Sequence, residues 1–399
     1  MQTLLMVGVG KSGRPYLDAA RRLGVRVHAV EVAERAATIE EAANEVTVCR
    51  GGSDELWAEA AITAARACQP DGVLAFSEPH VMAAALVADE FGLPGPSLRA
   101  ATLSRNKALQ RARFGASGIG QPEYLVTERI ADAAEWAEPR MPVVLKPLSS
   151  AGSDGVELVA DMAAYREAAR RRDGEGRLLV ERAVEGPEYS WEALVCDGNV
   201  WCANLTEKET TGPPDFVEVA HWAPADTGDT PHAVAADLGP AVLEAIGMRT
   251  GIVHLEFKLT PSGPAVMEIA VRTPGDCLMD LLGLAYGVDW FEMAIRAALG
   301  WELPEPPKAP VRFAASYLPS APAGTVVAVE GLDDVLAQPC VVSANVTVAP
   351  GQQVSPARSS GERAGEVVLA AENPGELAVD LEQVRRLLAV VTRPADPPG

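Results

Sequence analysis

The chain has 399 residues, of which 48% are hydrophobic and 22% charged, a balance typical of a globular protein with two or three domains. Its 34 basic and 55 acidic residues give a net charge of −21, which argues against a nucleic-acid partner and against binding to an anionic membrane surface. Six dispersed cysteines, with no C-x-x-C pair, no signal peptide and no long apolar run, predict reduced thiols in a soluble cytoplasmic protein.

The first quarter of the chain is expected to alternate buried strands and helices. Residues 3–9 form an apolar strand, and Gly8-Val-Gly-Lys-Ser-Gly13 matches G-x-G-x-x-G and opens a helix. The next strand ends at Glu31, 18 residues past the last glycine. This order is the dinucleotide-binding fingerprint, so an NAD-dependent oxidoreductase is an alternative function. The same glycines also allow the tight turn of doubly wound domains that bind other ligands, or none.

Glu78 is a candidate ligand residue in this doubly wound α/β region. A helix is predicted over 54–68, a strand over 72–76 and a helix over 79–91, so Glu78 follows the carboxyl end of a parallel strand. Open α/β sheets bind ligands at that edge, and Glu78 can hold a substrate amine there. An acid at a helix N-terminus, stabilised by the helix dipole, explains the same residue without a ligand.

Lys146 and the loop after it indicate a phosphate site. Lys146 closes the apolar strand predicted over 141–146, where its ammonium group points either to solvent or to a ligand. The loop Ser149–Gly155 is small and flexible enough to fold over phosphates with its backbone N–H groups. Farther on, a strand edge at Val180–Val184 offers backbone donors and acceptors to an adenine, and Glu188 can accept hydrogen bonds from ribose hydroxyls.

The most informative stretch is a predicted hairpin within residues 251–275. Apolar residues alternate with polar or small ones along both strands: Val253, Leu255 and Phe257 with His254, Glu256 and Lys258, then Met267, Ile269 and Val271 with Glu268, Ala270 and Arg272. If Pro261-Ser-Gly263 is a three-residue loop, Thr260 faces Pro264 and Glu256 lies opposite Glu268.

Two opposed carboxylates repel unless one takes up a proton or a cation lies between them, and Mg²⁺ prefers such oxygen ligands. Arg272 on the same face can bind a phosphate or carboxylate bidentately. A solvent-facing strand pair with ordinary surface charges is the alternative interpretation of this hairpin.

The C-terminal quarter is expected to form a small α+β unit. Pro304–Pro310 is a proline-rich linker, and strands are predicted over 311–318, 325–329, 341–346 and 366–371, followed by a helix over 374–391.

The motifs occur in a fixed order along the chain: Lys107, Leu145-Lys-Pro147, the Ser/Gly loop, Glu181, Gly186-Pro-Glu188, Glu256, Glu268 and Arg272. In this order the chain resembles the ATP-grasp superfamily and, more narrowly, its carboxylate–amine ligases, such as the L-amino acid (dipeptide) ligases. The resemblance covers essentially the whole chain. It implies a mixed α/β and α+β architecture, with a Rossmann-like domain over 1–103, a two-lobed ATP-binding body over 104–303 and a small C-terminal α+β domain over 304–399.

The resemblance also implies roles for individual residues. ATP would be held at its phosphates, adenine and ribose by Lys107, Lys146, Ser149, Ser150, Ser153, Glu181, Val184 and Glu188. Mg²⁺ would be held by Glu256 and Glu268, and Lys146, Glu268 and Arg272 would be the catalytic residues. The substrates would contact Glu78, Lys208, His221 and Arg272, with an ordinary partly buried histidine as the alternative for His221. These families often carry Asn as a third metal ligand where this chain has Ala270, which leaves the second metal ion open.

The activity implied by the resemblance is an ATP- and Mg²⁺-dependent ligase with one or two metal ions, in which Mn²⁺ can substitute. It would activate a small carboxylate, such as an amino acid, as an acyl phosphate and couple it to an amine, releasing ADP and phosphate. A carrier-protein thiol or bicarbonate is the alternative acceptor, and a non-catalytic ATP-binding regulator is a further class. Small molecules are the expected partners, a homodimer stays open as the oligomeric state, and secondary-metabolite biosynthesis is suggested by the family alone.

Overall fold

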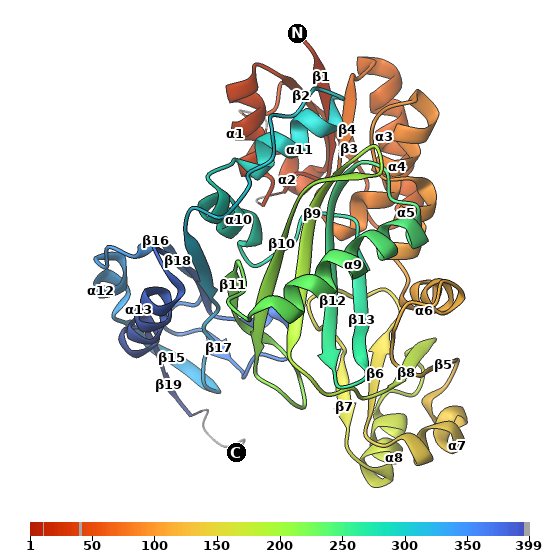
Figure 1. Ribbon diagram of the computed structural model, residues 1–399, viewed down its shortest axis with the longest axis vertical. Helices are drawn as coiled ribbons and strands as arrows, with labels where there is room; N and C mark the ends of the chain where they lie inside the picture. Colours follow the sequence, from red (N-terminus) through yellow and green to blue (C-terminus); the bar gives the residue numbers. More distant parts are fainter. Residues whose placement is uncertain (11, 40–41, 395–399) are drawn as a thin grey trace.

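The computed structural model describes residues 1–10, 12–39 and 42–394, so Lys11 of the glycine motif lies outside the described residues. Figure 1 shows the N-terminal elements at the top, a long sheet through the middle, a small lobe at the lower right and the C-terminal elements at the lower left. Parallel and antiparallel sheets are both present, as expected for a mixed α/β and α+β chain. No helix in the described ranges is long and apolar enough to cross a membrane.

The N-terminal region is a parallel sheet with strand order β3-β2-β1-β4. Its elements are β1 (Thr3–Val7), α1 (Arg14–Leu23), β2 (Arg26–Val32), α2 (Ala33–Ile39), β3 (Glu45–Cys49), α3 (Asp54–Cys68), β4 (Gly72–Leu74), the 3₁₀ helix η1 (Glu78–His80) and α4 (Val81–Phe91). Helix α3 has the predicted bounds, whereas β4 is shorter than predicted. The apolar run Leu4–Val7 is fully buried because parallel strands are covered by helices on both faces.

The turn formed by the glycine motif is stabilised by Glu31, the acid of the dinucleotide-binding fingerprint. One carboxylate oxygen of Glu31 accepts hydrogen bonds from the backbone N–H groups of Val9 at 2.8 Å and Gly10 at 2.6 Å. A Cβ atom at Gly8 would lie 1.9 Å from the ring of His80, and Gly8 has a φ of +69°. The acid that would meet a ribose in a dinucleotide enzyme therefore holds the turn itself, which favours the turn-forming interpretation of these glycines.

A small lobe follows, made of an antiparallel sheet with order β5-β8-β6-β7. Two helices precede it, α5 (Leu98–Ser104) and α6 (Lys107–Ala116), and they pack into the core of the large sheet. The lobe itself consists of β5 (Tyr124–Thr127), η2 (Ile130–Ala133), α7 (Ala134–Ala137), η3 (Glu138–Arg140), β6 (Val143–Pro147), β7 (Glu157–Val159), α8 (Met162–Arg171) and β8 (Leu178–Arg182). The Asn106 side chain caps α6 by accepting from two backbone N–H groups, which fixes Lys107 at the first position of the helix.

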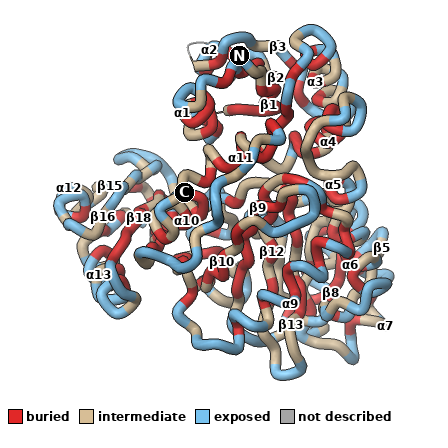
Figure 2. The backbone as a smooth tube through the Cα atoms, turned by 45° about the horizontal axis from the view of Figure 1, so that its top comes forward, coloured by how far each residue is buried: buried red, intermediate tan, exposed pale blue. Residues whose placement is uncertain are grey.

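The large sheet has the strand order β13-β12-β9-β10-β11-β14-β18-β16. Its strands and covering helices are β9 (Glu188–Cys196), β10 (Asn199–Thr210), β11 (Glu218–Ala223), α9 (Asp229–Ile246), β12 (Gly251–Thr260), β13 (Gly263–Ala270), α10 (Leu278–Tyr286), α11 (Trp290–Ala298), β14 (Phe313–Tyr317), β16 (Val341–Val346) and β18 (Gly365–Ala371). Helix α9 packs Leu238 and Val242 against Val253 and Leu255, and Figure 2 shows this buried layer along β9 and β12. One face is thus closed, and the other carries the polar side chains.

The C-terminal elements are joined to this sheet, because β14 pairs with β11 and carries β18 and β16 with it. The predicted division at 303 and 304 therefore crosses a continuous sheet and stays a prediction. A second sheet, β17-β15-β19, and two helices complete the region: β15 (Gly324–Glu330), α12 (Leu332–Leu336), β17 (Gln353–Val354), α13 (Pro374–Leu387) and β19 (Ala389–Arg393). The helix predicted over 374–391 was too long, since its end forms β19. Helix α10 was not predicted.

Candidate active site

The hairpin pairs the two acids as predicted, but by a different turn. Glu256 on β12 lies directly opposite Glu268 on β13. The connection is Pro261-Ser262, with Thr260 opposite Gly263 rather than Pro264, so the predicted three-residue loop was wrong. A β-bulge after Glu256 shifts the register by one residue and restores the pairing of the acids.

The bulge also changes where one side chain points. Phe257 lies opposite Val266, so Met267 is the extra residue of the bulge. Met267 was expected on the core face, but it lines the same cavity as Glu268. The remaining alternation is confirmed, since Val253, Leu255 and Phe257 are fully buried.

A cavity of about 250 Å³ lies between this hairpin, the small lobe and the loop at 150–156. It collects most of the predicted site residues: Lys107, Lys146, Ser150, Ser153, Glu181, Val184, Glu188, Lys208, His221, Glu256, Glu268 and Arg272. Ser149 and Glu78 do not line it. Glu78 instead accepts a hydrogen bond from the Arg272 Nε at 3.0 Å, which makes it a partner of a cavity residue.

The two lysines that were predicted to contact phosphates, Lys107 and Lys146, are held by buried or half-buried acids. Lys146 lies 2.8 Å from the Glu181 carboxylate, which also pairs with the fully buried Arg111. Burial opposes ionisation of Glu181, but Arg111 and Lys146 outweigh it and lower its pKa to about 2. Lys107 donates to the Ser150 carbonyl at 2.5 Å and lies 3.0 Å from Glu268. Both ammonium groups are therefore fixed at the cavity wall.

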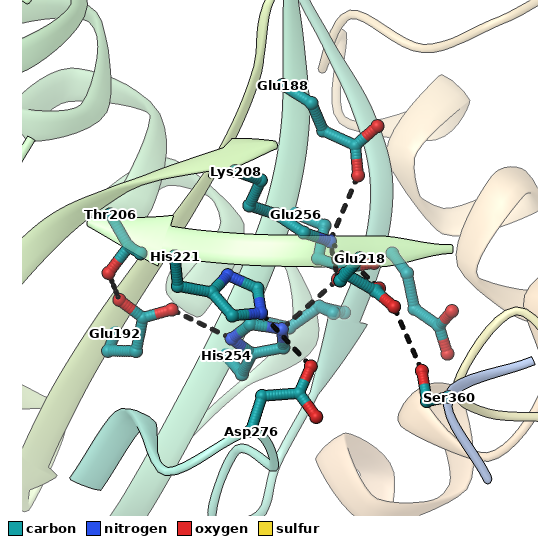
Figure 3. Close-up of polar contacts among 12 residues, drawn as sticks. Glu188, Glu192, Thr206, Lys208, Glu218, His221, His254, Glu256, Asp276 and Ser360 are labelled. Carbon is teal, nitrogen blue, oxygen red and sulfur yellow. Dashed lines mark hydrogen bonds and ion pairs between the residues drawn. The ribbon is translucent and has the colours of Figure 1, made fainter. Parts of the chain in front are cut away.

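Lys208 is the centre of an acidic cluster on the side of the cavity formed by the large sheet (Figure 3). Its Nζ lies 2.5 Å from Glu256, 3.0 Å from Glu188 and 3.4 Å from Glu218, and its side chain is only 2% exposed. Burial alone would lower the pKa of Lys208, but the three carboxylates raise it well above its usual 10.5. The same contact helps to hold the pKa of Glu256 well below 4.5 despite its burial. Lys208 and Glu256 are therefore both charged at neutral pH.

A second set of hydrogen bonds connects Glu256 to buried polar residues of the large sheet. His254 lies between Glu192 at 2.8 Å and Glu256 at 3.2 Å, and Glu192 also accepts from the Thr206 hydroxyl at 2.6 Å. Burial would lower the pKa of His254, whereas its hydrogen bonds to Glu192 and Glu256 raise it to about 9. The protonated imidazole of His254 orients Glu256. The sequence analysis did not identify His254 as a site residue, although His254 stands in the alternating polar row of the hairpin.

The other end of the cavity is built around Asp276. Its carboxylate accepts from the His221 Nε2 at 3.0 Å and is held bidentately by Arg363. Burial would raise the pKa of Asp276, but His221 and Arg363 lower it far below the usual value. Asp276 and Cys277 both have left-handed backbones, with φ of 58° and 60°. Residues other than glycine are held in this conformation mainly where the surrounding structure requires it.

Comparisons with known proteins agree with this geometry. A family model described as an ATP-grasp domain matches residues 139–280, and one described as L-amino acid ligase C-terminal domain 2 matches residues 316–393. The chain therefore contains an ATP-grasp domain, which supplies most of the residues that line the cavity.

Two relatives and one solved structure are similar to this chain over most of its length. It is 29% identical to an uncharacterized protein, y4rH, of Sinorhizobium fredii over 384 residues, covering 92% of this chain and 78% of the relative. It is 29% identical to carnosine synthase 1 of Gallus gallus over 327 residues, covering 74% of this chain and 35% of that protein, so it spans about a third of the relative's length. An L-amino acid ligase from Bacillus licheniformis has the same fold, with a TM-score of 0.85, 21% identity and coverage of 98% and 99%.

The donor set of the cavity fits the magnesium ion that an ATP-grasp domain implies. Among the described residues, no three His, Cys, Asp or Glu side chains form a ready-made metal group. Mg²⁺ usually needs only one or two protein carboxylates beside phosphate oxygens and water, and Glu256 and Glu268 provide two on facing strands. Ala270, which also lines the cavity, offers no ligand atom.

Among the cavity residues that the sequence analysis did not assign to the site, three make the polar contacts described above. His254, Glu218 and Asp276 line the cavity, but no motif marked them. The signal for His254 was its place in the polar row of the hairpin. Glu218 and Asp276 follow irregular segments, so only their long-range partners reveal them.

Proposed function

We propose that this chain uses ATP to activate a small carboxylate, of the amino acid class, as an acyl phosphate and then joins it to an amine. The observation that carries the proposal is the pairing of Glu256 and Glu268 in a cavity whose walls also present Lys107, Lys146 and Arg272. Opposed acids beside three cations suit a triphosphate with its divalent ion. The relatives named as a carnosine synthase and an L-amino acid ligase support an amino acid as substrate.

The first step transfers the γ-phosphoryl group. A substrate carboxylate oxygen attacks the γ-phosphorus, the bond to the bridging oxygen breaks, and ADP leaves. Catalysis of this step is mostly positioning and charge neutralisation. Lys107 and Lys146 are placed to bind the phosphate oxygens, and Arg272 is placed to stabilise the transferred phosphate. Glu256 and Glu268 would hold Mg²⁺ or Mn²⁺, which neutralises phosphate charge when bound.

The second step forms the amide. The neutral amine attacks the acyl carbon, the bond to the phosphate oxygen breaks, and the nitrogen loses a proton as phosphate leaves. The cavity wall formed by Lys208, His221 and Asp276 is our proposed site for the substrates of this step. Its polar side chains are already paired, so they give the wall a fixed arrangement before substrate arrives.

The nucleoside would lie along β8. The residues Arg182, Ala183 and Val184 line the cavity and can offer backbone groups to adenine, with Glu188 near the ribose. We assign Glu181 a different role from the adenine contact implied by the resemblance. Its carboxylate is 2% exposed and is occupied by Arg111 and Lys146, so it positions Lys146 instead.

The test is ATP-dependent phosphate release from the purified chain with pairs of amino acids, with product mass measured for each active pair. We expect one or more pairs to give a product whose mass is that of the two substrates less water, together with ADP and phosphate. If phosphate release requires a carrier-protein thiol or bicarbonate, that compound is the acceptor instead of an amine. No release with any acceptor, in a protein that binds ATP, would contradict the ligase proposal. The cytoplasmic location and the homodimer stay predictions.

A further inference from the structure

A segment from the C-terminal region reaches the edge of the cavity. We call residues 358–363 the C-terminal clasp; they include the 3₁₀ helix η4 (Ser360–Glu362) and lie between β17 and β18. Ser360 lines the cavity, and its backbone N–H donates to the Gly152 carbonyl at 2.9 Å. Gly152 belongs to the Ser/Gly loop of the small lobe. The clasp therefore touches the loop that is expected to cover the nucleotide phosphates.

The clasp is also fastened to the large sheet. The Ser360 hydroxyl donates to Glu218 on β11 at 2.9 Å, as Figure 3 shows. Arg363 pairs bidentately with Asp276, and its Nε donates to the Ser360 carbonyl at 2.9 Å. The side chains of Arg363 and Glu218 are each 10% exposed, and that of Asp276 is 17% exposed. Charge-assisted and largely desolvated contacts of this kind hold a segment firmly.

These contacts form one continuous path across the site. From Gly152 it runs through Ser360 to Glu218, and from Glu218 through Lys208 to Glu256. The path joins the Ser/Gly loop to the carboxylate proposed to hold Mg²⁺. The loop cannot move away from the cavity without breaking its hydrogen bond to the clasp.

We propose that Ser360 and Arg363 are positioning residues that hold the Ser/Gly loop closed over the cavity, so that nucleotide affinity depends on the clasp. The proposal rests on the proposed function only in taking ATP as the ligand of this cavity. The closed loop itself is a property of the protein without ligands. It can therefore be measured separately from turnover.

The hydrogen bond to Gly152 can be removed with one substitution. Ser360→Pro deletes the backbone N–H, whereas Ser360→Ala keeps it and deletes only the hydroxyl contact to Glu218. Proline is tolerated at the first position of a helix, which Ser360 occupies. The preceding residue, Ser359, already has the extended backbone that proline requires, with φ of −150° and ψ of 163°. The backbone change is thus compatible with the observed conformation.

The readout is hydrogen–deuterium exchange of a peptide covering residues 148–156, measured without ligands, together with the KM for ATP. Ser360→Pro is expected to speed exchange in this peptide and to raise the KM for ATP about 2- to 10-fold, the range for one net hydrogen bond. Its kcat is expected to change less than its KM. Ser360→Ala is expected to speed exchange of the peptide less than Ser360→Pro does, because it removes only the contact to Glu218 and keeps the hydrogen bond to Gly152.

Unchanged exchange in Ser360→Pro would overturn the proposal, whatever the enzyme does with amino acids. Faster exchange without ligase turnover by any form of the protein would instead leave the clasp standing and contradict the proposed function. Arg363→Gln provides the second variant, since it keeps the backbone and removes the bidentate pair with Asp276. It is expected to speed exchange of the same peptide, and exchange like that of the wild type would also overturn the proposal.

Discussion

Replacing Glu181 by Gln removes the counter-ion of two cations, one of them at the cavity wall. The Glu181 carboxylate is 2% exposed and pairs with Arg111, which is 1% exposed, and with Lys146 at 2.8 Å. The amide keeps the shape of the side chain but removes its charge. We expect a folded but less stable protein whose Lys146 is no longer held in place, and therefore a lower rate of ATP turnover.

The magnitude follows from the pKa of Glu181, which falls from 4.5 to about 2 in the folded protein. A depression of this size corresponds to about 3 kcal/mol of stability at neutral pH. Removing one partner of a buried ion pair costs about 3–5 kcal/mol, which agrees. Because the folded pKa is lowered, this contribution is complete above pH 4.5 and is lost as the pH falls toward 2. The stability deficit of the variant should shrink over that window.

Urea unfolding followed by fluorescence measures the deficit at pH 7 and at several lower pH values. Glu123→Gln is the matched control, because Glu123 also pairs with two arginines, Arg140 at 3.0 Å and Arg182 at 3.2 Å, but its side chain is 53% exposed. Exposed pairs contribute little, so the control should unfold like the wild type. Equal losses in the two variants, or a Glu181→Gln deficit that does not change with pH, would refute the reasoning.

Four further outcomes are expected. Lys146→Ala and Glu268→Ala should each lower the rate of ATP-dependent phosphate release by about 10²–10³, the usual loss for one preorganised charge, with circular dichroism like that of the wild type. Ala270→Asn, which adds an oxygen ligand beside Glu268, should lower the Mg²⁺ concentration that gives half the maximal rate; an unchanged concentration would argue against a metal at this position. Gly8→Ala should destabilise the protein to thermal unfolding by at least about 1 kcal/mol, because its Cβ would meet His80 in a left-handed backbone. Titration with NADH should give no fluorescence change, and saturable binding would restore the dinucleotide interpretation.

The order of the elements could be predicted from local patterns, and so could one face of the site. The alternation correctly predicted Val253, Leu255 and Phe257 in the core and Glu256 in the cavity. This was possible because successive side chains of a strand point to opposite faces whatever the rest of the fold is. The turn could not be predicted, since a two-residue turn with a bulge and a three-residue turn give the same pairing of Glu256 with Glu268. Pairing was therefore right although the turn was wrong.

The polar partners depend on distant segments, which is why sequence patterns did not reveal them. Arg363 meets Asp276 across 87 positions of the chain, and Arg111 meets Glu181 across 70. Neither pair has a local period, and each arginine alone is typical of a surface. Arg363 itself does not line the cavity, but it pairs with Asp276, which does.

The two opposed acids show how the fold balances charge before any ligand binds. Two carboxylates on facing strands call for a cation, and sequence reasoning assigned that role to a metal. In the structure Lys208 lies 2.5 Å from Glu256, and Lys107 lies 3.0 Å from Glu268, so each acid already has its own ammonium group. A metal ion arriving with a nucleotide would add positive charge at the acids and bring phosphate charge at the same time. Lys107, which also reaches the Ser150 carbonyl of the covering loop, is the group best placed to exchange its carboxylate for a phosphate. The hydrogen bonds of Glu268, Lys107 and the Ser/Gly loop would then rearrange together when a nucleotide binds, because Lys107 contacts both the acid and the loop.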